Sequence, residues 1–418
     1  MIHPRIPARA GPRPSSGGIT CPYCFTVMPR REVRFRCQGG ALGRGSGCQP
    51  QVDQVLADYL GSTVAATLPP VFSGDGRRQR ANCPRCSQET SRRVCPSCHN
   101  QFPAQYCETP GRIVALVGAK NAGKSTYIAV LLHELEHRLG SELKTSLVAC
   151  DDRTIDRYQQ DFARPLFGEH RLLPTTQSAA TEIRWPMVFQ LSRTREGRFR
   201  RHDASLALVL FDTAGEDLGR RDLVDLHLRY LTAADAIIFL VDPLELPGAG
   251  ADTQAEARAA IGPDGDTNPL QVLGRVTDTL RSGHELRPGQ RLKVPLAVCL
   301  TKIDVLQPSL ARQSPLHRPR PRSARLDLDD REAVHEQVRA MLHSWHADGL
   351  DHYLRYNYAE YGFFGLSALG GLPRDGVVAP GGIRPYRVED PLLWLLHRYG
   401  MLDAGRGAPG QRPNSGAW

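Results

Sequence analysis

A glycine-rich segment that ends in lysine and serine is the part of the sequence with the clearest chemical capability. Residues 118–125 read GAKNAGKS and lie between a run of five apolar residues and a helical pattern. Gly118 and Gly123 allow backbone conformations in which successive N–H groups point at an anion. Lys124 adds a cation for the β- and γ-phosphates, and the Ser125 hydroxyl suits Mg²⁺. The order strand, loop, helix predicts a phosphate-binding loop.

Cysteines are the second such group, and nine of the eleven lie before residue 108. In a reducing compartment this clustering favours metal over disulfides. Two C-P-x-C motifs eight residues apart predict a compact zinc ribbon, and a third C-x₂-C pair with two irregularly spaced cysteines predicts a second site. The expected ligands are Cys83, Cys86, Cys95 and Cys98 for the ribbon, and Cys21, Cys24, Cys37 and Cys48 for the second site. Spacing does not decide whether the pairs close as separate ribbons or exchange ligands.

His99 and Cys107 lie close to these motifs and are interpreted as bystanders. Four thiolates complete a structural zinc site, so a further ligand is not required. We therefore expect one or two structural Zn²⁺ ions held by thiolates alone.

The positive charge of the chain is concentrated at its N-terminal end. The formal net charge is +9, and residues 1–110 carry fourteen arginines, no lysine and six acidic residues. Such a region suggests nucleic acid or another acidic partner. Each Zn(Cys)₄ centre would carry a net charge of about −2, which removes about half of this excess. The charge therefore permits nucleic-acid binding without indicating it.

Three later motifs each follow a hydrophobic strand pattern, where ligands of open α/β sheets bind. In D-T-A-G, Asp212 can hold Mg²⁺ through a water and the Gly215 N–H can meet a γ-phosphate. In T-K-I-D, Asp304 can accept two hydrogen bonds from guanine, which adenine cannot supply, and the Lys302 stem can lie along the base. The S-A-L tripeptide at 367–369 can bring a backbone N–H to guanine O6.

Together these four motifs resemble G1, G3, G4 and G5 of P-loop GTPases of the TRAFAC class, which contains the Ras-like and Era-like proteins. The resemblance covers about residues 112–400, and T-K-I-D stands where N-K-x-D is commoner. It implies binding of GTP or GDP with Mg²⁺. The implied nucleotide-binding residues are Lys120, Asn121, Ala122, Gly123, Lys124, Ser125, Thr126, Asp212, Gly215, Thr301, Lys302, Asp304, Ser367, Ala368 and Leu369.

The resemblance also implies catalytic and metal-binding roles. A switch I threonine is expected, with Thr175, Thr176 and Thr181 as candidates. Glu216 stands where Ras-like proteins carry a water-orienting glutamine, and it could position the water or simply be a solvated acid. Asn121 matches an asparagine that helps to bind K⁺ in Era-like GTPases. The alternative is that Asn121 is an ordinary surface residue of the loop. The catalytic set is Lys124, Thr176 and Glu216, and the Mg²⁺ ligands are Ser125, Thr176 and Asp212.

Alternating strand and helix patterns predict an α/β domain with a mainly parallel sheet and helices on both faces. Small zinc-ribbon modules precede it. The expected boundaries are a disordered 1–18, modules at 19–62 and 81–110 around a linker at 63–80, the P-loop GTPase domain at 111–400, and a disordered tail at 401–418. Insertions are expected near 243–270 and 307–330, the second as a mobile loop. The layout is similar to double-GTPase families of bacterial conflict-type systems, which implies a role in defence or signalling.

These observations lead to a functional expectation. We expect a GTP-binding protein that hydrolyses GTP slowly with Mg²⁺ and acts as a switch, while its zinc ribbons bind a protein partner. The alternative is a nucleic-acid-binding or scaffold adaptor in which the nucleotide is structural, and an ATP-driven enzyme is disfavoured by Asp304. A nucleotide-dependent dimer is compatible with the K⁺ comparison. No apolar run approaches the ~20 residues of a membrane span and no secretory signal is visible, so we expect a cytoplasmic protein.

Overall fold

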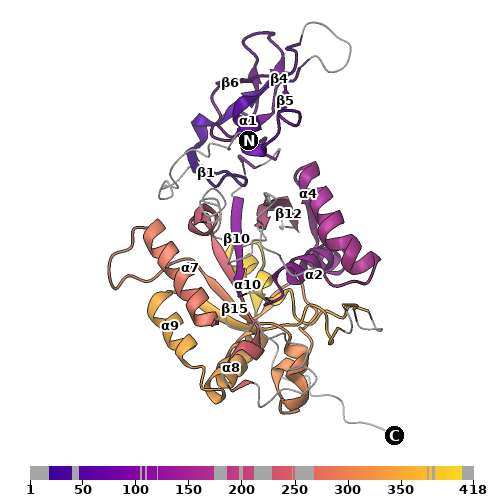
Figure 1. Cartoon of the computed structure of the whole chain (residues 1–418), viewed down its shortest axis with the longest axis vertical. Helices are drawn as coiled ribbons and strands as arrows, with labels where there is room; N and C mark the ends of the chain where they lie inside the picture. The colour runs from indigo at the N-terminus through magenta and orange to yellow at the C-terminus, as the bar shows by residue number, and fades with distance from the viewer. Residues whose placement is uncertain are drawn as a thin grey trace.

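A computed structural model describes most of the chain as a cysteine-rich unit packed on an α/β domain (Figure 1). The described residues are 18–39, 47–103, 106–108, 111–119, 121–173, 186–196, 201–210, 228–246, 248–249, 268–373, 376–378 and 382–406.

A seven-stranded sheet of order β11-β12-β13-β10-β14-β15-β17 forms the centre of the α/β domain. The strands are β10 (Gly111–Gly118), β11 (Thr145–Ala149), β12 (Met187–Glu196), β13 (Arg201–Leu210), β14 (Ala236–Val241), β15 (Leu296–Leu300) and β17 (Tyr361–Gly365). The five strands from β13 to β17 are parallel, whereas β12 runs antiparallel to β13, and β11 to β12. The predicted mainly parallel sheet is confirmed. β12 begins directly after Pro186, because proline cannot donate a ladder hydrogen bond.

Helices cover both faces of this sheet, and its strands β14 and β15 are apolar and buried at every residue. One face packs on α2 (Lys124–Glu136), α3 (Arg138–Leu143), the π-helix η2 (Tyr158–Gly168) that continues α4 (Asp152–Arg157), and α10 (Asp390–Arg398). The other packs on α7 (Pro269–Gly283), α8 (Leu328–Ser344), α9 (Gly349–Asn357) and a helix at 228–233. Residues 331–354 have the sequence pattern of one long helix. In the structure, however, α8 ends at a turn in which His346 is left-handed (φ 56°) and the Ala347 N–H donates to Leu342 O.

The segment expected to be a mobile loop is instead folded against the domain. It contains the short helices η6 (Gln307–Ser309) and η7 (Pro315–His317), which follow η5 (Ile303–Val305). Arg320 is buried between Glu142 and Glu389, with Nε 3.2 Å from the Glu389 carboxylate. Two carboxylates from other elements fix this arginine, and a composition rich in Arg and Pro does not reveal such long-range partners.

The ordered chain also extends further toward the C-terminus than expected. Met401 and Leu402 are buried, and β18 (Ala404–Gly405) pairs in parallel with β16 (Leu326–Asp327). The folded part of the described chain therefore continues past the boundary expected at residue 400. The expected tail from 407, the residues before 18 and residues 250–267 lie outside the described residues.

The two expected zinc modules are interleaved in one unit. Its elements are β1 (Gly18–Thr20), β2 (Val27–Pro29), η1 (Arg30–Glu32), β3 (Arg34–Arg36), β4 (Gln51–Val52), α1 (Gln54–Leu60), β5 (Thr67–Leu68), β6 (Val71–Phe72), β7 (Ala81–Asn82), β8 (Glu89–Thr90) and β9 (Arg93–Val94). β3 lies between β6 and β9, and β4 pairs with β5. The expected linker therefore supplies strands to the unit, and the sheet joins both expected modules.

Candidate nucleotide site and cysteine centres

The glycine-rich loop connects β10 to α2 with the backbone geometry that its sequence predicts. A Cβ atom on Gly118 would lie 2.6 Å from the carbonyl oxygen of Leu240 in the neighbouring strand, so this position requires glycine. Gly123 (φ 80°) and Asn121 (φ 65°) are left-handed. The Lys124 ammonium is buried and donates to the carbonyl oxygens of Gly118, at 2.9 Å, and Ala119, at 2.7 Å. Lys124 is therefore held against the backbone of the loop in which a phosphate would bind.

The amino end of α2 faces the same loop. Gly123 is its N-cap and offers no side chain that could cap this 13-residue helix. Ala122 is fully buried below the loop, while Ser125 and Thr126 are partly exposed in the first turn. The N–H groups of a helix's first turn and the positive end of its dipole favour an anion here.

The T-K-I-D and S-A-L segments lie side by side at the same edge of the sheet. The Thr301 N–H donates to Val241 O at 2.9 Å, and the Ile303 N–H donates to Leu366 O at 3.1 Å. Because β10, β14, β15 and β17 are consecutive parallel strands, these segments and the glycine-rich loop follow carboxyl ends that meet at one edge. Asp304 is partly buried there, and Ser367 is buried with its N–H bonded to Tyr386 O. Ala368 and Leu369 pack on the core below.

This edge is also where the order of the strands reverses. The chain places β11, β12 and β13 on one side of β10, and β14, β15 and β17 on the other. Ligands of open α/β sheets bind at such a switch point. Lys120, Thr175, Thr176, Thr181, Asp212, Gly215 and Glu216 lie outside the described residues, so their predicted roles remain predictions.

Asp242 is a residue of this edge that the sequence reasoning missed. Its side chain is only 3% exposed and accepts a hydrogen bond from the Lys302 ammonium at 2.5 Å. Lys302 has a left-handed backbone (φ 51°), and the pair fixes both the strand end and the turn before Asp304. The signal that could have identified Asp242 is its position directly after an apolar strand, which the aspartate of D-T-A-G shares.

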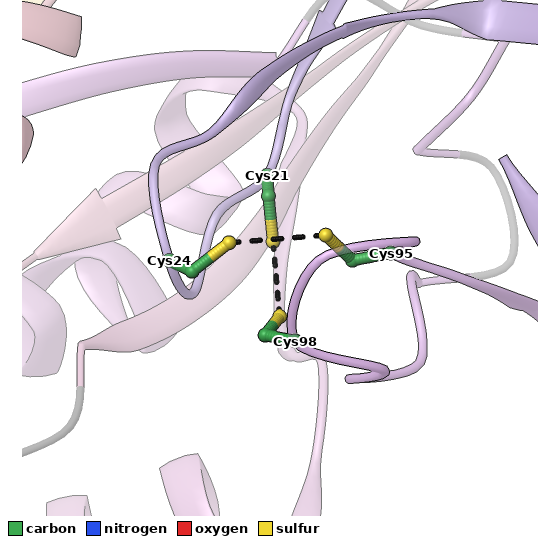
Figure 2. Close-up of side chains that lie close together, drawn as sticks. All are labelled: Cys21, Cys24, Cys95 and Cys98. Atoms are coloured by element: carbon green, nitrogen blue, oxygen red, sulfur yellow. Dashed lines mark hydrogen bonds between the residues drawn. The ribbon is translucent and has the colours of Figure 1, made fainter. Parts of the chain in front are cut away.

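The eight predicted zinc ligands form two groups of four, with partners exchanged between the expected modules. Cys21 and Cys24 meet Cys95 and Cys98 (Figure 2), while Cys37 and Cys48 meet Cys83 and Cys86. The prediction that Cys83, Cys86, Cys95 and Cys98 form one ribbon is therefore wrong. The structure has the exchange of ligands between the expected modules, an alternative that the spacing left open. Because β9 pairs antiparallel with β3, Cys95 directly after β9 and Cys37 directly after β3 lie at opposite ends of the strand pair.

The sulfur positions fit a tetrahedral metal ion. The Sγ–Sγ distances are 3.7 Å for Cys21–Cys98 and 3.8 Å for Cys24–Cys95 in one group, and 3.5 Å for Cys37–Cys86 and 3.8 Å for Cys48–Cys83 in the other. Zn–S bonds of about 2.3 Å give tetrahedron edges of about 3.8 Å. Burial raises the pKa of Cys21 and Cys98, whereas hydrogen bonds from three neighbouring thiols lower that of Cys24. Four converging thiolates suit a structural Zn²⁺ without an open coordination position.

His99 and Cys107 belong to neither group of four. The His99 Nδ1 instead lies 2.8 Å from Asp53, which also pairs with Arg36 at 2.8 Å and caps α1 through the Leu56 N–H. Burial opposes the charge of Asp53, but hydrogen bonds from His99 and Arg36 lower its pKa to about 2. This geometry agrees with the bystander interpretation of both residues.

The first cysteine group lies at the contact between the cysteine-rich unit and the α/β domain. Its four sulfurs belong to fully buried residues that share a hydrophobic core with Ile113 of β10. The Tyr23 hydroxyl donates to Asp151 at 2.8 Å, and the Phe25 ring lies 5.3 Å from that of Tyr230 in the helix at 228–233. Figure 1 shows the unit beyond the amino end of β10. It is therefore on the side opposite the sheet edge that carries the glycine-rich loop and T-K-I-D, which is the candidate nucleotide edge.

Tyr230 connects this contact to the strand that leads into the glycine-rich loop. Among the described residues, β10 pairs with β13 as far as Ile113. Beyond that point the Tyr230 hydroxyl donates to Val114 O at 2.9 Å and accepts from the Leu116 N–H at 3.2 Å. The buried phenol thus takes the place of a neighbouring strand.

Comparison with known families identifies the domain that this geometry forms. Residues 112–368, more than half of the chain, match the family model described as Double-GTPase 2. The chain belongs to the Double-GTPase 2 family. The matched residues contain the glycine-rich loop, T-K-I-D and the start of S-A-L, and they form a GTP-binding domain of the GTPase type. The resemblance to P-loop GTPases of the double-GTPase type is confirmed.

Individual proteins are similar to this Double-GTPase 2 chain to different extents. A Mycolicibacterium smegmatis protein named "Putative ESX-1 scaffolding and assembly protein SaeC" is 28% identical over an alignment of 408 residues that covers 91% of this chain and 99% of that protein. The GDP- and phosphate-bound Ski7 GTPase-like domain of S. cerevisiae is 16% identical with a TM-score of 0.31, over 69% of this chain and half of that one. The GDP form of the signal recognition particle receptor SRb of Chaetomium thermophilum is 12% identical with a TM-score of 0.25, over 63% and 94%. Within the described residues, the search for a helix long and apolar enough to cross a membrane finds none.

Proposed function

We propose that the protein is a slow, Mg²⁺-dependent GTPase that acts as a switch. The observation that supports this most directly is the position of Asp304 on the edge that also carries the glycine-rich loop. The loop N–H groups and Lys124 would hold the phosphates, and Asp304 would select guanine while Lys302 is fixed by Asp242. Ser125, Thr176 and Asp212 would hold Mg²⁺, which neutralises charge on the β- and γ-phosphates.

An exchange of the base-reading residue tests this proposal. Asp304 would pair with the N1–H and exocyclic amine of guanine, whereas xanthine carries a carbonyl oxygen in place of that amine. Asp304→Asn supplies an amide N–H for this oxygen, so the variant should lose affinity for GDP and gain affinity for XDP by at least about tenfold each. Both affinities are measured by competition with a fluorescent nucleotide, with ADP as a third competitor. Equal binding of GDP and ADP by the native protein would refute guanine selection.

The cysteine-rich unit would read the nucleotide state through Tyr230. The unit lies on the side of the sheet away from the nucleotide edge, so direct contact with the phosphates is excluded for its described residues. The helix at 228–233 follows the D-T-A-G region in sequence and contacts both Phe25 and β10. Release of the γ-phosphate would alter the segment before this helix, and the helix would transmit that change. Glu216, and a K⁺ ion at Asn121, are the proposed aids to hydrolysis.

A scaffold in which GTP or GDP is structural is the second candidate. The similarity to a protein named for scaffolding and assembly over 91% of this chain favours it. Phosphate release with K⁺ or Na⁺ distinguishes the candidates, since a switch turns over GTP and a locked scaffold retains it. The described structure gives less support to a nucleic-acid adaptor, because Arg36 and Arg93 of the cysteine-rich unit are ion-paired with Asp53 and Glu108.

A further inference from the structure

The outer edge of the central sheet has backbone groups available for pairing. β11 is the outermost strand and has β12 as its one partner among the described strands. The Cys150 N–H donates to Val188 O, which fixes the alternation of the antiparallel ladder. Even-numbered residues therefore direct their N–H and C=O groups to β12. The odd-numbered residues Thr145, Leu147 and Ala149 direct theirs outward.

Among the described residues, this edge lacks the features that normally prevent sheets from joining. Natural edge strands are protected by charged side chains, proline or bulges. β11 reads T-S-L-V-A, and its register with β12 is continuous over all five residues, without a bulge. Ser146 is exposed and Val148 is 59% exposed on the same face of the strand. The strand therefore remains competent to pair.

We propose that β11 pairs antiparallel with β11 of a second copy of this chain, with Leu147 on the twofold axis. In this register Thr145 faces Ala149 and Ser146 faces Val148 of the second copy. All outward N–H and C=O groups of the three odd-numbered residues then find partners, because an antiparallel pair exchanges two hydrogen bonds at alternate positions.

Charge favours a second copy as the occupant of this edge. The five residues of β11 carry no charge, so the two copies do not repel each other along the strand. At each end, Lys144 of one copy lies opposite Cys150 of the other, next to the acidic Asp151 and Asp152. A twofold axis repeats this favourable arrangement at both ends. Leu147 and Ala149 already pack on the domain core, so the edge is pre-formed.

The resulting dimer is distinct from one that joins two nucleotide sites. Pairing through β11 makes one continuous sheet and leaves the carboxyl ends of β10, β14, β15 and β17 uncovered. Its affinity should therefore be the same with GDP and with a non-hydrolysable GTP analogue. A failure of guanine binding would leave this prediction intact, and a failure of dimerisation would leave the nucleotide proposal intact.

A charge-pair design tests the register by sedimentation equilibrium of the full chain. In the proposed dimer residue 148 faces residue 146 of the second copy, so S146K/V148K places lysine opposite lysine twice, and S146E/V148K places lysine opposite glutamate twice. The first variant should raise the dimer Kd at least about tenfold, and the second should bring it back to within about threefold of the native value. Thermal unfolding verifies that both variants are folded. I155K is the control, because Ile155 is 46% exposed on α4 and lies outside the strand.

Each outcome decides the proposal. A concentration-dependent native dimer with the predicted order of Kd values supports it. A native chain that is monomeric at about 100 µM overturns it. So does a dimer with the same Kd in both double variants, because that dimer uses another surface.

Discussion

Removal of one buried hydroxyl, by Tyr230→Phe, should loosen the strand that leads into the glycine-rich loop. The Tyr230 hydroxyl satisfies Val114 O and the Leu116 N–H, and all three residues are buried. Phenylalanine keeps the ring and its contact with Phe25 but leaves both backbone groups without this partner. A buried polar group that loses its partner costs about 1–3 kcal/mol, so the two together should cost about 2–6 kcal/mol.

Hydrogen exchange measures this effect where it arises. If 2 kcal/mol of the cost falls on local opening, the amides of residues 114–118 should exchange roughly 30-fold faster in the variant. The whole protein should also unfold at a lower temperature. Faster GDP dissociation would follow, because Gly118 ends the same strand.

Tyr356→Phe is the matched control, since Tyr356 is 72% exposed and loses only a solvated hydroxyl. Its exchange rates in β10 should equal those of the native protein. If Tyr230→Phe leaves these rates unchanged as well, the hydroxyl does not take the place of a neighbouring strand, and the route proposed from the cysteine-rich unit to the loop is refuted.

Three further perturbations follow from the same contacts. Asp242→Asn removes the charged partner of a partly exposed lysine and should weaken GDP binding about three- to tenfold in a fluorescence titration, whereas unchanged binding would mean that the pair does not position the T-K-I-D turn. A chelator followed with a zinc indicator should remove one equivalent quickly from the group with the partly exposed Cys86 and a second slowly from the group with the buried Cys95, and simultaneous loss would contradict this order. Burial raises the pKa of Asp390 to about 7, above that of the unfolded chain, so its contribution to stability is highest below about pH 4 and is lost as pH rises to about 7. The melting temperature of the native protein minus that of Asp390→Asn should therefore fall between pH 5 and 8, and a flat difference would show that Asp390 is ionised throughout.

Local patterns predicted the nucleotide edge well. A phosphate-binding loop needs a strand, glycines and a helix start within about fifteen residues, and T-K-I-D needs only the end of a strand. Once the strands are parallel and adjacent, these short segments meet at one edge without further information. Hence the relation of Gly118, Lys124 and Asp304 to the sheet could be predicted from the sequence.

Long-range partners could not be predicted in this way. Cys21 lies 77 residues before Cys98 in the sequence, and every C-x₂-C pair has the same local appearance. The choice of partner depends on the pairing of β9 with β3. A strand of only two residues, such as β9, leaves no recognisable pattern in the sequence from which this pairing could be predicted. Arg320 was expected in a mobile loop for the same reason, since its carboxylate partners come from distant elements.

The exchange of cysteine partners has a consequence for how the protein can work. Two independent ribbons could each bind zinc and move as separate modules, but the observed groups cannot form until residues 18–108 have folded together. The first group also shares its core with Ile113 and Tyr230, so the same packing stabilises the metal centre and the strand before the glycine-rich loop. Coupling through this packing is reciprocal, so zinc would change the affinity for a nucleotide by the same factor by which that nucleotide changes the affinity for zinc. Zinc retained at Cys21, Cys24, Cys95 and Cys98 should therefore be held more tightly in whichever nucleotide state orders the helix at 228–233.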